Sequence, residues 1–407
     1  MKQTNLLKTS LAAALLFTIV SCNKNNDRSF VQDKPEAVSE EMMLEKGANP
    51  DEAAIKNATT PDNTAARNDD QHYLFTESNA AGVNAILKYR IRNNGSLQLA
   101  ETIQAGGAGT GVKLGSQGAV VVDKEHEWLY AVNAGSNSIS SYKIHGDGSL
   151  TLAHTENTHG TIPVSVTVHG DLLYVLNRGT DNIHGFRIGA GGMLTAIPGS
   201  GRSLSSTAVD APQLSFLPNG DWIVVTEKAT NKISTYKVKN DGSVNAGIFT
   251  SSTGQTPFGF DFSRGEFMIV SNASGGAAGA GTATSYVTGN SGVPQSVNGA
   301  KANYQAAPCW VAVTKYGRYA YITNTASNNI SSYYVDSWGG LYLVNGNAAA
   351  TDMGPLDVVV ASNNYYVYTL NSVSHTITGY NREVLGGLHF MSRESTVPDA
   401  ATGLATF

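Results

Sequence analysis

The chain has 407 residues, a length that holds either two average domains or one large all-β ring. Only 14% of the residues are charged, the formal net charge is -5, and glycine is abundant at 43 residues. This composition favours a turn-rich β protein, and an acidic balance without a basic stripe argues against nucleic-acid binding.

The N-terminus carries two lysines and then an apolar run that is too short for a stable membrane span, the pattern of a secretory signal. The run ends at Ile19-Val-Ser-Cys22, which resembles the cleavage box of bacterial lipoproteins. We therefore predict a signal peptide over residues 1–21 and acylation of Cys22, which would anchor the protein to a membrane. The alternative is an ordinary signal with an incidental cysteine. The expected location is the bacterial cell envelope, and Asn23 after Cys22 favours the outer membrane.

Residues 22–70 contain more acidic than basic residues, few β-branched residues and a single aromatic residue, Phe30. Such a segment cannot bury a core, so we predict a disordered tether. The only other cysteine is Cys309, so the mature chain is expected to have no structural disulfide.

A repeat begins at residue 73 and continues to the C-terminus. The segment Tyr130-Ala-Val-Asn133 is followed by a polar corner and by Ile-Ser-Ser-Tyr142, and Tyr321-Ile-Thr-Asn324 begins a close copy. We assign the position of Asn133 in successive repeats to Thr76, Asn133, Asn177, Thr226, Ser271, Asn324 and Asn371. These spacings of roughly 44 to 57 residues, with about four short strands in each repeat, are typical of propeller blades.

The segment from Pro212 to Val244 illustrates one blade, because apolar β-rich runs alternate with Pro-Asn-Gly and Asn-Asp-Gly turns. Six innermost strands are expected, and most of them follow a proline. The first repeat lacks an innermost strand, and the tail from Pro398 to Phe407 is available to supply it. We therefore predict an all-β, seven-bladed β-propeller over residues 71–407, closed by pairing of the C-terminal strand with the N-terminal blade. It should be a monomer.

In such a blade the start of the innermost strand lies beside the end of the second strand. Both positions should surround the mouth of the channel, which makes them candidate site positions. The residues expected there are Gly118, Val164, Gln213, Phe258, Cys309, Leu356 and Thr402 from innermost strands, and Glu77, Ala134, Arg178, Glu227, Asn272, Thr325 and Ser372 from second strands.

The Tyr-Val-x-Asn repeats and the segments 224–228, 256–260 and 309–324 resemble the bacterial lactonase-like seven-bladed propellers. That family includes 6-phosphogluconolactonases and fungal carboxymuconate lactonising enzymes, and the resemblance covers about residues 71–407. It implies a site with a His after one innermost-strand start, an Arg after the next, and a Glu at the end of that blade's second strand. Glu227 matches the Glu, whereas Gln213 and Val164 stand in the Arg and His positions.

Glu227 is therefore the candidate catalytic residue, because a carboxylate shielded by the ring can serve as a general base. The alternative is an ion pair with Lys228, Lys232 or Arg178. Arg178 is expected to clamp a carboxylate of the substrate, or else to pair with Glu227.

The other candidate substrate-binding residues are Gln213, Glu77, Asn272, Phe258 and Cys309. We predict no metal site and no cofactor, although the oxygen ligands Glu77, Glu227 and Asn272 would suit a channel cation such as Ca²⁺. Cys309 has no histidine at the mouth to activate it and is more typical of a small buried residue.

Two functions remain open. The first is a lactonase-like hydrolase or cycloisomerase that acts on a small lactone or organic acid outside the cytoplasm. The second is a non-catalytic surface propeller that binds a glycan, a peptide or a protein partner.

Overall fold

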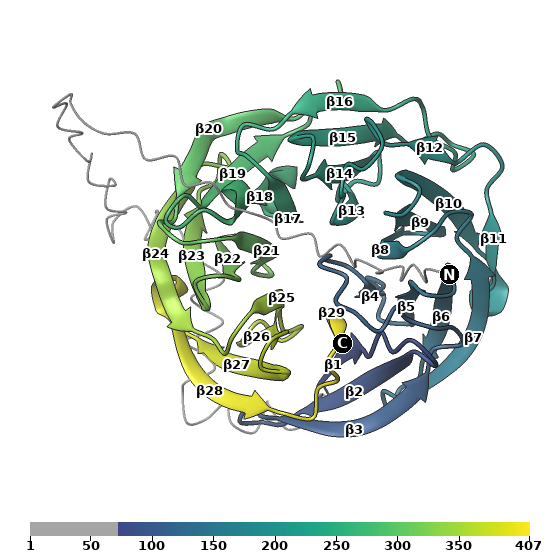
Figure 1. The fold of residues 1–407 in the computed structure, drawn as a ribbon, viewed down its shortest axis with the longest axis horizontal. Helices are drawn as coiled ribbons and strands as arrows, with labels where there is room; N and C mark the ends of the chain where they lie inside the picture. Colours follow the sequence, from purple (N-terminus) through teal and green to yellow (C-terminus); the bar gives the residue numbers. More distant parts are fainter. Residues whose placement is uncertain (1–71) are drawn as a thin grey trace, which may run out of the picture. The chain divides into compact units, whose positions relative to one another are not determined.

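The computed structural model describes residues 72–407, which form a ring of seven antiparallel β-sheets (Figure 1). Each sheet is one blade, and its strands follow one another from the centre of the ring outward. The innermost strands contact one another in ring order, from β29 through β4, β8, β13, β17, β21 and β25 back to β29. The all-β, seven-bladed propeller predicted from the repeat spacing is confirmed.

The strands of blades 1 to 3, from the centre outward, are β29 (Thr402–Thr406), β1 (His72–Glu77), β2 (Ala85–Ile91) and β3 (Leu97–Gln104); β4 (Val120–Val122), β5 (Trp128–Asn133), β6 (Ser138–Ile144) and β7 (Leu150–Asn157); and β8 (Pro163–His169), β9 (Leu172–Asn177) and β10 (Asn182–Ile188), which pairs with both β11 (Leu194–Ala196) and β12 (Arg202–Ser203).

The strands of blades 4 to 7 are β13 (Gln213–Phe216), β14 (Trp222–Glu227), β15 (Lys232–Lys237) and β16 (Ile248–Ser251); β17 (Pro257–Phe262), β18 (Met268–Asn272), β19 (Thr282–Val287) and β20 (Gln295–Ala302); β21 (Pro308–Val313), β22 (Tyr319–Asn324), β23 (Asn329–Val335) and β24 (Leu341–Ala350); and β25 (Pro355–Val360), β26 (Tyr366–Asn371), β27 (Thr376–Arg382) and β28 (Leu388–Glu394). Short 3₁₀ turns are η2 (Ala190–Gly192), η3 (Arg264–Glu266), η4 (Ser274–Gly276) and η5 (Val384–Gly386).

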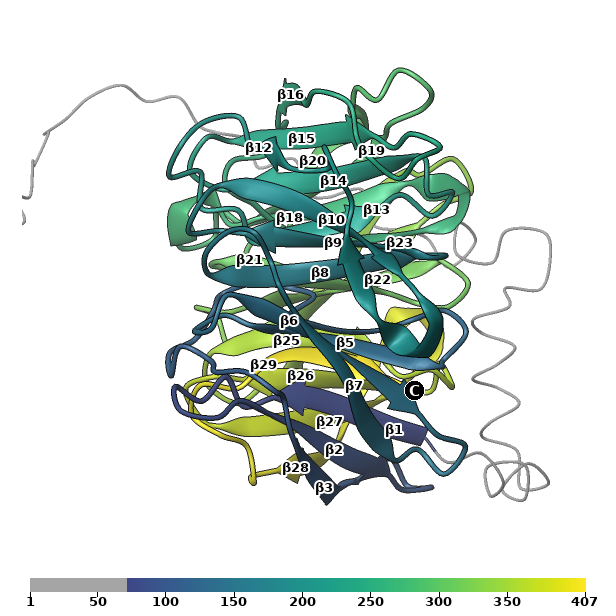
Figure 2. The ribbon, with the colours of Figure 1, turned by 90° about the vertical axis from the view of Figure 1, so that its right-hand side faces the viewer.

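The C-terminal strand closes the ring, as predicted. β29 pairs antiparallel with β1, with Leu74 opposite Thr406 and Glu77 opposite Thr402 (Figure 2). The Tyr73 and Phe407 backbones exchange two hydrogen bonds of 3.2 and 3.0 Å beyond this pairing. Closure covers the inner edge of β1, an edge that would otherwise be open to association.

The second and third strands are buried on both faces because a neighbouring blade covers each face. All six residues of β14 are buried, for example. In most blades the turn between the third and fourth strands packs on an aromatic side chain of the preceding blade, as Gly292 does on Trp222. Gly292 has a φ of +72°, and a Cβ there would collide with the indole ring. The glycine turns of the sequence therefore bring adjacent blades together.

Polar side chains join the innermost strands across the blade seams. Asp357 Oδ2 in β25 accepts the N–H of Leu404 in β29 at 2.9 Å, and Asp261 Oδ2 in β17 accepts that of Val313 in β21 at 2.7 Å. Burial raises the pKa of Asp357 to about 7 and that of Asp261 to about 6, while the backbone donors act in the opposite direction. These carboxyls satisfy backbone N–H groups on innermost strands.

The signal peptide predicted over residues 1–21, the acylation site at Cys22 and the tether up to residue 70 lie outside the described residues. Within residues 72–407, no helix has the length and apolar character needed to span a bilayer.

Candidate functional site

Innermost strands begin, and second strands end, on the same face of the ring. Pro163 lies opposite Asn177 in blade 3, and Pro308 lies opposite Asn324 in blade 6. We call this the mouth face. The expected side-by-side arrangement of the two sets of strand ends is confirmed.

Each second strand ends at a fully buried polar residue. These seven residues are Glu77, Asn133, Asn177, Glu227, Asn272, Asn324 and Asn371. Asn371 is representative, because its Nδ2 donates to Thr376 Oγ1 at 3.2 Å and to Thr378 Oγ1 at 3.0 Å in the third strand. The shared position therefore fixes the corner between the second and third strands.

The repeat alignment is wrong by one residue in blades 1, 4 and 5. The strand ends show that the position of Asn133 belongs there to Glu77, Glu227 and Asn272, and not to the residues before them. Successive side chains of a strand point to opposite faces, so this shift moves the three side chains into the blade corners. The residues that follow the corner in these blades are Ser78, Lys228 and Ala273.

Glu227 is completely buried, and its carboxylate accepts four hydrogen bonds. Ser234 Oγ donates to Oε1 at 2.5 Å, and Thr230 Oγ1 donates to Oε2 at 2.7 Å. The other two come from Ser205, whose backbone N–H donates to Oε1 at 3.0 Å and whose hydroxyl donates to Oε2. Glu227 thus ties the corner of blade 4 to the segment 204–211, which joins blades 3 and 4.

Glu77 occupies the same position in blade 1 in a poorer hydrogen-bonding environment. Its Oε2 accepts one bond of 3.0 Å from Asn84 Nδ2, and its Oε1 has no partner among the described residues. Burial raises the pKa of Glu77 well above its usual value, opposed by the Asn84 hydrogen bond. Asn272 donates to Thr282 and Thr284 within its own blade. Both predicted substrate-binding residues are therefore enclosed in blade corners.

Charged side chains do meet at the mouth face, between blades 3 and 4. Lys228 Nζ lies 2.9 Å from Asp210 Oδ2, and Arg178 Nη1 lies 3.9 Å from Asp210 Oδ1. The Asp210 side chain is 52% exposed, whereas those of Lys228 and Arg178 are 14% and 24% exposed, so solvent reaches the cluster mainly at Asp210. Burial lowers the pKa of Arg178, and Asp210 opposes that shift. Lys228 follows Glu227, the last residue of β14, so a repeat alignment with the correct strand end would have identified it. Asp210 lies outside the repeated strands, so the repeat pattern does not identify it.

Phe258 and Cys309 lie beside this cluster. Lys228 Nζ stands 4.4 Å from the centre of the Phe258 ring, which packs on Trp310 at a centroid distance of 4.9 Å. Cys309 is buried, and its thiol donates to Ala307 O at 3.2 Å. Burial raises the pKa of the Cys309 thiol to about 11, so its thiolate is scarce at neutral pH. Phe258 thus supplies an apolar wall, and Cys309 is part of the packing.

Gln213, the predicted substrate-binding amide, joins two blades instead. Its Nε2 donates to Phe260 O at 2.9 Å, and its Oε1 accepts the Phe260 N–H at 2.7 Å. Both ends of the amide are therefore paired with the backbone of β17.

The segment before β4 crosses the mouth of the channel, where a loop reaches the middle of the ring in Figure 1. Gln117 Nε2 donates to Val311 O at 2.7 Å, and Trp310 Nε1 donates to Ser116 O at 2.9 Å. Leu114 O accepts a hydrogen bond from Arg178 Nη1. The segment before β4 thereby contacts blades 3 and 6, and it covers part of the predicted site.

Residues 72–407 contain no group of three or more His, Cys, Asp or Glu side chains arranged to hold a metal ion. The oxygen ligands considered for Ca²⁺ are engaged elsewhere: Glu77 and Asn272 bond within their own blade corners, and Glu227 bonds within its corner and to Ser205.

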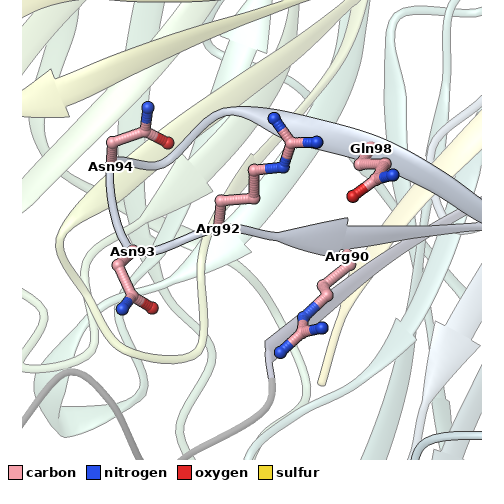
Figure 3. A pocket seen from close by; sticks show the side chains of 5 residues that line it. All are labelled: Arg90, Arg92, Asn93, Asn94 and Gln98. Carbon is pink, nitrogen blue, oxygen red and sulfur yellow. The ribbon is translucent and has the colours of Figure 1, made fainter.

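Two hollows lie away from the mouth cluster. One, of about 420 Å³, is lined by Arg90, Arg92, Asn93, Asn94 and Gln98 of blade 1, with Arg92 between Asn94 and Gln98 in the view of Figure 3. All five residues are exposed. The other, of about 400 Å³, lies between blades 6 and 7.

The family model described as "Lactonase, 7-bladed beta-propeller" matches residues 50–209, which confirms the resemblance seen in the repeats. No curated protein matches the chain. The ring is similar to a candidate 6-phosphogluconolactonase from Bacteroides fragilis, with 18% identity, a TM-score of 0.63, and coverage of 83% of this chain and 98% of that chain. It is also similar to the periplasmic gluconolactonase PpgL of Pseudomonas aeruginosa, with 15% identity, a TM-score of 0.64, and coverage of 83% and 99%. At these identities the similarity concerns the fold.

Proposed function

We propose that this chain, a seven-bladed propeller resembling the lactonase family, is a hydrolase or cycloisomerase that acts on a small lactone or organic acid at its mouth face. The observation that carries the proposal is the cluster of Lys228, Arg178 and Asp210 beside the ring of Phe258. Lys228 and Arg178 carry two positive charges and Asp210 carries one negative charge. The cluster therefore has a net positive charge that can bind a negatively charged oxygen of the substrate. The lactonase resemblance supports the reaction class.

In hydrolysis, a water oxygen would attack the lactone carbonyl carbon while Asp210 accepts a proton from that water. Lys228 would stabilise the negative oxygen of the tetrahedral intermediate. The ring C–O bond then breaks, and the leaving alkoxide takes the proton back from Asp210. The product is a hydroxy acid, whose carboxylate Arg178 can bind through its guanidinium.

Glu227, the general base predicted from the sequence, receives a different role in this proposal. Its carboxylate is buried beneath four donors, and two of them belong to Ser205. Ser205 belongs to the segment that carries Asp210, and Asp181 holds the same segment by accepting the N–H groups of Ala208 and Val209. Glu227 would thus position Asp210, whereas direct base catalysis by Glu227 would require this segment to move away.

The test is hydrolysis of glucono-δ-lactone and a panel of other lactones, followed with a pH indicator. We expect Asp210→Asn and Lys228→Met to lower kcat by about 10²–10⁴-fold with little change in melting temperature. Lys237→Met, which removes an ion pair with Asp221 on the same blade, is the matched control. Unchanged turnover in both mouth variants would refute the assignment. A loss confined to Glu227→Gln would return the base role to Glu227.

A non-catalytic binding module is the second candidate function. It is favoured by the segment Leu114–Gln117, which covers part of the mouth, and by Gln213 and Val164 at the family's Arg and His positions. Absence of turnover by the wild-type protein on every lactone tested would support it.

We propose that the protein acts in the bacterial cell envelope. The lipoprotein-like sequence before Cys22 supports lipid anchoring in the bacterial cell envelope, where the protein, proposed to be a monomer, would meet substrates outside the cytoplasm.

A further inference from the structure

The groove between blades 6 and 7 has a lining unlike the mouth cluster. It lies where β24 and β28 contact each other, at the rim of the ring. Its main contributors are Asp352 from blade 6 and Thr378, His389, Phe390 and Arg393 from blade 7. An aromatic face, an acid and a guanidinium thus share one hollow of about 400 Å³.

A β-bulge brings the aromatic ring and the guanidinium to the same side of blade 7. Phe390 pairs with Tyr380 and Arg393 pairs with Thr378. One residue of β27 lies between Thr378 and Tyr380, whereas two residues of β28 lie between Phe390 and Arg393, so β28 contains one extra residue. In a regular strand, residues three apart point to opposite faces, and a bulge restores them to one face. Both side chains therefore lie over Thr378 and Tyr380.

Arg393 and Asp352 of the groove form an ion pair with no net charge. Arg393 Nη2 donates to Asp352 Oδ1, and Thr376 Oγ1 donates to Asp352 Oδ2 at 2.7 Å. Asp352 is only 15% exposed, whereas Arg393 is 56% exposed and keeps N–H groups facing solvent. The arginine charge is balanced, which favours a neutral ligand with both hydroxyl donors and acceptors. The hollow around Arg90 and Arg92 lacks such an acid in its lining and would suit an anion.

Phe390 supplies a platform at the other end of the groove. Its side chain is 50% exposed, and its ring packs edge-on against Tyr380 at a centroid distance of 6.1 Å. Tyr380 is held in turn by a hydrogen bond of 2.8 Å from its hydroxyl to Ala350 O of blade 6. A rigid ring held over a blade seam offers a flat apolar surface at low entropic cost.

The other blades provide an internal comparison. Blades 1 and 2 have the same bulge, but Leu99 and Leu152 stand where blade 7 has Phe390. At the position of Arg393 these blades have Thr102 and Thr155. The aromatic and ion-pair combination of blade 7 is therefore not required by the bulge or by blade packing.

We propose that the groove between blades 6 and 7 binds a neutral saccharide, with a pyranose ring stacked on Phe390 and vicinal hydroxyls bonded to the Arg393–Asp352 pair. The site is independent of the mouth cluster and of lactone turnover. It would hold the propeller on a polysaccharide or glycan.

The test is calorimetric titration of the full mature chain with neutral hexasaccharides of glucose, mannose, xylose and N-acetylglucosamine. We expect at least one of them to bind, and Phe390→Ala to weaken that binding at least about tenfold, since each tenfold change is ~1.4 kcal/mol. Leu152→Ala, at the equivalent bulge of blade 2, is the matched control and should leave the affinity within about twofold.

Three results would overturn the proposal. They are no binding by wild type at saccharide concentrations of roughly 10 mM, equal binding by wild type and Phe390→Ala, and binding of oligogalacturonate but of no neutral saccharide. Melting temperatures of the variants separate a binding defect from misfolding. Lactone turnover should be unchanged in Phe390→Ala, so the two proposed sites can fail separately.

Discussion

Replacing Asp357 by asparagine should reduce the loss of stability that accompanies a rise in pH from acidic to neutral. The Asp357 side chain is 2% exposed and lies at the seam where the C-terminal strand closes the ring. Burial raises its pKa from 3.8 to about 7, so the folded protein binds this proton more tightly than the unfolded chain does. The resulting stability is fully present below pH 3.8 and is lost as the pH rises through about 7.

Between pH 5 and the folded pKa of about 7, this carboxyl accounts for roughly 3 kcal/mol of lost stability, at ~1.36 kcal/mol for each pH unit. For a domain of this size, ~1 kcal/mol shifts the melting temperature by about 2 °C, so the loss corresponds to roughly 6 °C. Asparagine resembles the protonated carboxyl in shape and charge. Asp357 Oδ1 accepts the N–H of Val358 and Oδ2 accepts that of Leu404, so asparagine keeps an acceptor for only one of them and cannot ionise. The lost hydrogen bond lowers stability equally at every pH in the range, so it does not affect the pH dependence.

The assay is differential scanning calorimetry at a fixed scan rate between pH 5 and pH 8, on wild type and Asp357→Asn. We expect the melting temperature of wild type, relative to that of the variant, to fall by several degrees over this range. Asp147→Asn, in an exposed turn where Ser149 donors lower the pKa of the carboxyl, is the control. A constant difference between wild type and Asp357→Asn across the range would show that Asp357 is ionised at pH 5, and the reasoning would be wrong.

Two further predictions concern the ends of the chain. Deleting residues 401–407 removes β29 and leaves the inner edge of β1 unpaired, so we expect insoluble protein or a strongly lowered melting temperature; a truncated protein that melts like wild type would contradict ring closure by the tail. Cys22→Ser should release the protein from the membrane fraction or leave it as an uncleaved precursor, as judged by fractionation and immunoblotting, and a cleaved variant that still sediments with membranes would contradict acylation.

The ring could be predicted from the sequence because its signals are local and repeated. Glycine turns, prolines before the innermost strands and Tyr-Val-x-Asn segments each specify one element, and seven repetitions specify the blade count. The closure by the tail followed from a missing strand in the first repeat, since an open ring would leave edges exposed. The structure has these elements at the predicted places.

The site could be predicted only as a face of the ring. Asp210 lies in an irregular segment between blades 3 and 4, and no periodicity fixes the conformation of such a segment. The same limit applies to Leu114 and Gln117, which reach blades 3 and 6 over the mouth. The sequence assigns Gln213 and Phe258 to the correct strands, but sequence spacing does not indicate which side chains form hydrogen bonds with the backbone of a neighbouring blade, as Gln213 does with Phe260.

The two buried glutamates show what an isolated motif match can and cannot establish. Glu77 and Glu227 end the second strands of their blades, a position that the other five blades fill with asparagine. Because this position fixes the corner between the second and third strands, both glutamates are expected to have a structural role. They differ in what lies against them, because Glu227 binds Ser205 of the segment that carries Asp210, whereas Glu77 has a single donor from Asn84. Glu227, the glutamate that matches the lactonase-like propellers, therefore lies in the blade corner that is bonded through Ser205 to the segment of the mouth cluster. In the reaction proposed above, the proton acceptor is Asp210, the carboxylate of this cluster that solvent can reach.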